Sequence, residues 1–218
     1  MPSDMPTRSC REPMVITSDL RSAGVSLIVG MKKRCDLLNL ASALATVIPH
    51  RDSDPDGVTA IEDRGASEAA LVGFTRSALP LHTDRSSAPE PPALLITVCA
   101  RTGASGGQSL LADGAAVYQE LAATAPESLE VLCTPRSAMF GGADGHLGSV
   151  FTRRPDGLVT VRFRLDALAR FGPAVAPHLP VLPWGSSPAR YASAATAAGR
   201  TGDLPDAPRR VFRAGRQE

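Results

Sequence analysis

The chain has 218 residues, a length that suits one medium-sized globular domain with a substantial core. Hydrophobic residues make up 43% and charged residues 21%, and 23 basic side chains nearly balance 22 acidic ones. This balance gives no global field that would draw the protein to nucleic acid or to an anionic membrane, so we expect neither as a partner.

The cysteines and the beginning of the chain favour a reduced, cytoplasmic protein. The four cysteines lie far apart and form no C-x-x-C pair, which argues against a zinc knuckle and against a disulfide scaffold. Residues 1–13 are polar, contain prolines and lack the apolar segment of a signal peptide, and we expect them to form a disordered leader. No apolar run is long enough to span a bilayer.

The first half of the chain is expected to combine short strands with one helix. Residues 25–29 alternate larger apolar and small side chains between two glycines, which predicts a strand. Leucines at helical spacing predict a helix over residues 36–44. A turn-forming loop with the sequence HRDSDPDG follows at 50–57, and residues 59–61 are expected to return as a strand. Residues 93–100 (ALLITVCA) predict a buried strand.

The second half is expected to combine two helices with several short strands. Apolar spacing predicts one helix that ends before Pro126 and a second that begins at this proline. Strands are expected at Ala138–Phe140, 149–152 and 158–163, and a short helix at 165–171.

The composition changes after residue 182. Residues 183–218 are rich in Ala, Arg, Ser, Gly and Pro and have no sustained apolar period. We expect a divergent, poorly ordered tail that forms no strand, and we place the globular domain at residues 14–182.

The run Leu81-His82-Thr83-Asp84 carries the strongest chemical signal. In an extended segment, residues i and i+2 project to the same face, so His82 and Asp84 can offer an imidazole nitrogen and a carboxylate oxygen to one cation. With a second histidine, this is the ligand set of non-haem Fe(II) oxygenases. Taken alone, H-x-D is a weak motif, because most such tripeptides lie on protein surfaces.

Five segments extend the pattern across residues 49–166. They read PHRDSDPDGVTAIED (49–63), LPLHTDRSSAPEPPALLITVCAR (79–101), GGQSLLADG (106–114), PRSAMFGGADGHLGSVF (135–151) and VRFRLD (161–166). Together they resemble the TauD/TfdA (taurine dioxygenase-like) family of Fe(II)/2-oxoglutarate-dependent oxygenases, within the clavaminate-synthase-like superfamily. The resemblance implies a mostly β fold with flanking helices, a double-stranded β-helix or jelly roll, incomplete at its C-terminal end.

The resemblance also implies roles for single residues. His82 and Asp84 would be iron ligands, and Ser109 stands where related enzymes place a hydroxyl that binds the 2-oxoglutarate carboxylate. The alternative for Ser109 is a turn hydroxyl that bonds its own backbone. Arg85, beside the ligands, would contact the substrate.

Arg162, Arg164 and Asp166 alternate along a predicted strand and therefore share one face. In related oxygenases that act on amino acids, charged groups in this region touch the substrate. The resemblance thus implies substrate contacts for Arg164 and Asp166 and a small, amino-acid-like substrate. The alternative is a solvated face of ion pairs, which we prefer for Arg162, and Asp166 can equally cap a following helix.

The other histidines give no comparable signal. His146 lies in the Gly-rich run GGADGHLG and is expected in a loop, His178 at the surface, and His50 in a structural position. The family takes its third ligand and its 2-oxoglutarate-binding arginine from a late segment that reads like G-x-G-x-x-x-x-D-N-x-x-x-x-H-G-R. Residues 183–218 contain no match to it.

The sequence therefore leaves three candidate functions. The first is an Fe(II)/2-oxoglutarate-dependent dioxygenase, an oxidoreductase that uses O₂ to hydroxylate a small molecule. The second is a catalytically inactive remnant or binding module of the same fold, which lacks the distal histidine and arginine. The third is an unrelated cupin-like metalloprotein that uses His82, Asp84 and His146.

Overall fold

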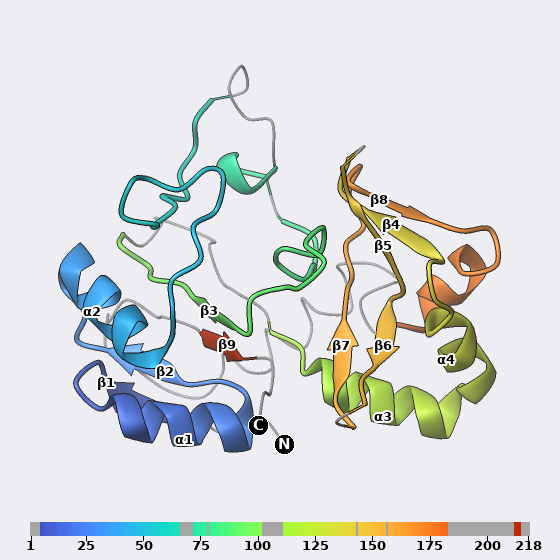
Figure 1. The fold of residues 1–218 in the computed structure, drawn as a ribbon, viewed down its shortest axis with the longest axis horizontal. Coiled ribbons are helices and arrows are strands. Elements are labelled where there is room, and N and C mark those ends of the chain that lie inside the picture. Colours follow the sequence, from blue (N-terminus) through green and yellow to red (C-terminus); the bar gives the residue numbers. More distant parts are fainter. Residues whose placement is uncertain are drawn as a thin grey trace.

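A computed structural model describes residues 5–65, 72–77, 79–101, 111–142, 144–155, 157–182 and the backbone of 212–214. Its elements form two groups that lie side by side (Figure 1). The first group holds the N-terminal helices, and the second holds the later helices and most of the antiparallel strands. Each group has its own cluster of buried apolar side chains.

The first group is built on a short parallel strand pair. β1 (Thr7–Ser9) pairs with β2 (Leu27–Val29), and α1 (Pro13–Ala23) connects them. α1 begins at a proline and ends at Gly24, whose φ of 71° provides the left-handed cap. α2 (Arg34–Leu44) packs against α1. The buried core of this group consists of Ile16, Leu20, Ile28, Met31 and Leu40.

Part of the predicted leader is structured. Residues 7–9 form β1 because their backbone groups pair with β2, and Leu27 also donates its backbone N–H to the Pro6 carbonyl. A polar composition does not prevent this pairing, since it uses main-chain groups alone. Residues 7–9, which were expected in a disordered leader, therefore form a strand in the structure.

β3 (Leu94–Ile96) completes the first group. Leu94 and Ile96 pack against its core, and β9 (Phe212–Ala214) pairs with β3 in the antiparallel sense. β9 lies in the tail that was predicted to form no strand, so three residues correct that prediction. An edge strand offers unpaired backbone groups, and a segment without an alternating apolar pattern can pair with them.

The second group begins with two helices. Asp113 caps α3 (Gly114–Thr124) by accepting hydrogen bonds from the backbone N–H groups of the next turn. α3 ends at Thr124, and Pro126 opens α4 (Pro126–Leu132), as the apolar spacing predicts. The described residues also include two 3₁₀ helices, η1 (Val72–Phe74) between the groups in sequence and η2 (Ala176–Val181) at the end of the second group.

Five strands follow the helices in the second group. They are β4 (Ala138–Phe140), β5 (His146–Gly148), β6 (Phe151–Arg153), β7 (Val159–Val161) and β8 (Ala169–Phe171). β4 pairs with both β5 and β8, and β6 pairs with β7, always in the antiparallel sense. The second core combines side chains of α3, α4 and β6 with those of residues in the connecting segments. Its buried members are Val117, Leu121, Leu129, Leu132, Val150, Phe151, Phe163, Val175 and Leu182.

The predicted jelly roll is confirmed only in part. The described strands are three residues long and lie in four small sheets, three of them antiparallel, and no closed barrel is formed within the described ranges. Two local predictions are wrong. Residues 59–61 form no strand, and residues 165–171 form a turn followed by β8 rather than a helix. Pairing with β4 overrides the helical spacing of 165–171.

Candidate metal site

The H-T-D segment lies beside the residues that follow β7 in the sequence. The Thr83 backbone N–H donates to the Phe163 carbonyl at 2.7 Å, and the Thr83 hydroxyl accepts from the Phe163 N–H at 2.9 Å. Leu81 packs against the second core. Because Leu81 and Thr83 are attached to the second group, the alternating residues His82 and Asp84 project to the other side.

His82 and Asp84 converge, as their i, i+2 spacing predicts. His82 Nε2 lies 3.4 Å from Asp84 Oδ1. The other ring nitrogen, Nδ1, lies 2.8 Å from the Pro80 carbonyl oxygen, which can only accept, so Nδ1 carries the proton. The interaction with the Asp84 carboxylate raises the pKa of His82, and burial opposes this effect. This tautomer directs the Nε2 lone pair of the neutral ring toward Asp84.

A third ligand is not gathered at this place. Among the residues that the structure describes, no three side chains of His, Cys, Asp or Glu are grouped so that they could hold a metal ion. His146 therefore does not join His82 and Asp84, which removes the support for the cupin-like function. The role of His82 and Asp84 as iron ligands stays a prediction.

Arg164 and Asp166 form an ion pair beside His82. The Arg164 Nε lies 2.7 Å from Asp166 Oδ1, and a second contact joins Arg164 Nη2 to Asp166 Oδ2. The hydrogen bond from Arg164 is the main reason that the pKa of Asp166 is lowered, and the charge of His82 adds to it. Asp166 Oδ1 also accepts from the Leu168 N–H at 3.0 Å, so it caps a turn rather than the expected helix.

Arg162 corrects a prediction. Only 5% of this residue is exposed, and its guanidinium donates to the main-chain carbonyls of Ser86, Ala88 and Pro89. It therefore does not belong to a solvated face of ion pairs. Alternation placed Arg162 on the face of Arg164, but sequence could not reveal its burial, because its acceptors lie more than 70 residues away.

Two predicted site residues remain, Arg85 and Ser109. Arg85 is half-buried next to Asp84 and has a φ of 53°, a left-handed conformation that non-glycine residues seldom adopt. Ser109 lies outside the described residues. Its assignment to 2-oxoglutarate, like the substrate contacts of Arg85, Arg164 and Asp166, stays a prediction.

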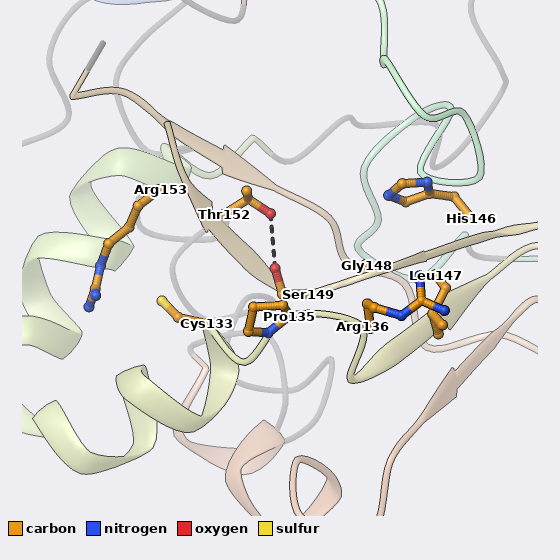
Figure 2. Close-up of a pocket in the computed structure, with 9 residues that line it drawn as sticks. All are labelled: Cys133, Pro135, Arg136, His146, Leu147, Gly148, Ser149, Thr152 and Arg153. Carbon is orange, nitrogen blue, oxygen red and sulfur yellow. Dashed lines mark hydrogen bonds between the residues drawn. The ribbon is translucent and has the colours of Figure 1, made fainter. Parts of the chain in front are cut away.

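His146 opens β5 rather than lying in a loop. It lines a cavity of about 400 Å³ together with Arg136 and Arg153, which lie toward opposite ends of the view (Figure 2). Burial and the nearby charge of Arg162 lower the pKa of His146. His82 and Asp84 are not among the residues that line this cavity.

The other two histidines have structural partners. His50 Nδ1 accepts from the Asp52 N–H and lies 3.1 Å from the Asp52 carboxylate, within the turn where a structural role was expected. His178 contacts the Ser128 hydroxyl at 2.9 Å and is half-buried rather than exposed. His50 and Asp52 repeat the H-x-D spacing of the candidate site, but His50 turns Nδ1 toward its carboxylate and not Nε2.

Comparison with known proteins gives the family. Residues 15–214 match the family model described as Taurine catabolism dioxygenase TauD, TfdA family. This match runs beyond residue 166, where the last of the resembling segments ends, and includes β9. Comparison with curated proteins finds no match. No helix of the described residues is long and apolar enough to cross a membrane. The chain belongs to the TauD/TfdA family.

Proposed function

We propose that this protein is an Fe(II)/2-oxoglutarate-dependent oxygenase of the hydroxylase type that acts on a small, amino-acid-like molecule. The family generally uses Fe(II), 2-oxoglutarate and O₂, and the match covers most of the chain. The observation that carries the proposal for this chain is the pairing of His82 Nε2 with Asp84 Oδ1, while His82 Nδ1 is held by the Pro80 carbonyl.

The donor set fits a divalent iron ion. Ligand atoms that are about 2.0–2.2 Å from one first-row cation lie at most about 4.4 Å apart. The 3.4 Å between His82 Nε2 and Asp84 Oδ1 falls within this limit without any rearrangement. A metal-ligating histidine commonly donates its other ring N–H to a backbone carbonyl, and Pro80 provides such an acceptor. Imidazole with carboxylate is also a donor combination that suits Fe(II).

The residues of the chain would bind and orient the reactants. Bound iron, together with 2-oxoglutarate and O₂, supplies the oxidation of an unactivated C–H bond. His82 and Asp84 would hold the metal, and the Ser109 hydroxyl would bind the 2-oxoglutarate carboxylate. Arg164 and Asp166 place opposite charges side by side near His82, and this arrangement complements the carboxylate and ammonium groups of a zwitterion.

Anaerobic titration with Fe(II) and then 2-oxoglutarate tests the proposal. We expect a visible charge-transfer absorption band only when both are present, and its loss in His82→Ala and Asp84→Ala. His50→Ala is the matched control, because it removes a histidine of the same H-x-D spacing whose ring faces its carboxylate through the other nitrogen. Succinate release under O₂ with candidate amino acids then defines the substrate.

The same titration separates the alternatives. A protein that binds neither Fe(II) nor 2-oxoglutarate would be a remnant or binding module, and the two-donor set within the described residues is the observation that keeps this alternative open. Metal binding without any effect of 2-oxoglutarate would contradict the oxygenase and indicate another metalloprotein. A band that survives in His82→Ala would contradict the site assignment.

A further inference from the structure

Arg162 is a buried cation that binds main-chain carbonyls. Its Nη1 donates to the Ser86 oxygen at 2.8 Å and to the Ala88 oxygen at 2.5 Å, and its Nη2 donates to the Pro89 oxygen at 2.5 Å. Burial lowers the pKa of Arg162, as expected for a charge removed from water, and its hydrogen-bond acceptors in the described structure are carbonyl dipoles. A buried guanidinium is tolerated when its donors are satisfied in this way.

These three carbonyls belong to the turn that follows Asp84. Residues 84–89 form this segment of turn and bend, the 84–89 turn, and Arg85 within it has a φ of 53°. Thr83, on the other side of Asp84, is hydrogen-bonded to the backbone of Phe163. The backbone that carries Asp84 is thus attached at both ends to consecutive residues, Arg162 and Phe163. Asp84 itself has a half-exposed side chain, so its position depends on this backbone rather than on packing.

Close packing also supports the turn from the side of β4 and β5. Gly141 follows β4 with a φ of 100°, and a Cβ atom there would lie 2.9 Å from Ser87 Cβ. A Cβ atom at Gly148 in β5 would lie 3.0 Å from the His146 ring and 3.6 Å from Arg162 Cδ. Both glycines therefore leave room for the turn and for the arginine that holds it.

We propose that Arg162 is a positioning residue that fixes the 84–89 turn so that the Asp84 carboxylate faces His82 Nε2. Its effect on metal affinity rests on the proposed function, whereas its effect on the turn can be measured without metal. Lysine cannot replace it fully, because one ammonium group does not reproduce the planar fork that reaches three carbonyls.

Hydrogen–deuterium exchange and anaerobic Co(II) or Fe(II) titration test this role. Arg162→Met keeps an apolar stem and removes the donors, and Arg162→Lys is a milder change that keeps the charge. Arg153→Met is the matched control, because Arg153 contacts Glu130 and Tyr118 and not the turn. We expect faster amide exchange over residues 84–88 in Arg162→Met and metal affinity about 10–100-fold weaker, with an intermediate effect for lysine and none for the control.

Each result decides one part of the inference. Unchanged exchange over residues 84–88 in folded Arg162→Met or Arg162→Lys overturns it. Faster exchange with metal affinity within about twofold of wild type also overturns the positioning role, since ligand alterations of this kind usually cost more. A wild-type protein that binds no metal would contradict the proposed function, while faster exchange in the arginine variants would still support the attachment of the turn. An unfolded Arg162→Met leaves Arg162→Lys to decide.

Discussion

The two groups of elements bury different kinds of side chain. The first core is aliphatic and lies between α1, α2 and the parallel pair β1–β2. The second core includes Phe151 and Phe163 and lies between α3, α4, η2 and antiparallel strands. Edge-to-face contacts add to it, such as Tyr118 against Phe151 at 5.6 Å between ring centroids. The candidate site is attached to the second group.

The two groups therefore differ in their relation to the candidate site. Thr83 is hydrogen-bonded to Phe163, and Arg162, Arg164 and Asp166 all come from the same short stretch after β7. The first group contributes no side chain to the described contacts of His82 and Asp84. We therefore expect substitutions that destabilise the second core to disturb the site as well. Substitutions that destabilise the first core equally should leave the site intact.

The largest effect is expected for Phe163→Ala. This side chain is 1% exposed, and its loss should destabilise the protein by about 3–5 kcal/mol. Because the Phe163 backbone holds Thr83, metal affinity should fall as well. Urea unfolding and metal titration measure both effects. A destabilised variant that binds metal with wild-type affinity would show that the second core is not the support of the site.

Leu40→Ala is the counterpart in the first core. Leu40 is 2% exposed, and its truncation should cost about 2–5 kcal/mol. Where the variant is still folded, metal affinity should stay at the wild-type level, because α2 packs against α1, whereas His82 and Thr83 are held by Pro80 and Phe163. A parallel loss of affinity would indicate that the two cores act as one unit. Unfolding followed by two probes, one in each group, would also detect this.

Metal affinity should depend on pH through His82. Nε2 must lose its proton to bind a cation, and the carboxylate of Asp84 raises the pKa of His82 above its ordinary value of 6.5. Affinity should therefore begin to fall at a higher pH than for a free histidine, by up to about tenfold per pH unit below the raised pKa. Titrations across pH 6 to 8.5 measure this dependence. A flat profile would mean that His82 is not a ligand.

The sequence predicted the features that depend on neighbouring residues. Pro126 marks the beginning of α4 because proline suits the first helical turn, and β4 was predicted within its observed bounds. The convergence of His82 and Asp84 follows from the two-residue repeat of extended chain. These signals are local, and no distant contact is needed to read them.

Features that depend on distant contacts were missed. β8 forms because β4 pairs with it, although the stretch around Ala169–Phe171 has helical spacing. Arg162 appeared to be one member of a charged face, and only its distant acceptors explain its burial. Likewise the Pro80 carbonyl, which fixes the His82 tautomer, carries no side-chain signal in the sequence.

A smaller effect is expected at the cap of α3. Asp113 Oδ1 accepts from the Ala115 N–H at 2.9 Å, so Asp113→Ala should cost about 1 kcal/mol by leaving helical donors unpaired. Asp113→Asn should recover most of this loss, because its amide oxygen can accept the same bonds. Thermal unfolding compares the three proteins. Equal midpoints for alanine and wild type would show that the cap makes no net contribution.

The smallest effect is expected for Arg34→Gln, which sharpens the comparison between arginines of the two groups. Arg34 forms ion pairs with Asp54 and Asp56 at 2.6 Å each, whereas Arg162 binds main-chain carbonyls, yet 44% of the Arg34 side chain is exposed. Solvent and salt screen such pairs, so the unfolding midpoint should be unchanged at physiological salt and slightly lower only at low salt.

The hydrogen bond from Arg34 is the main reason that the pKa of Asp56 is lowered. The low-salt difference should therefore be present at neutral pH and vanish as acid protonates Asp56. A large, salt-independent loss would mean that exposure does not separate Arg34 from Arg162.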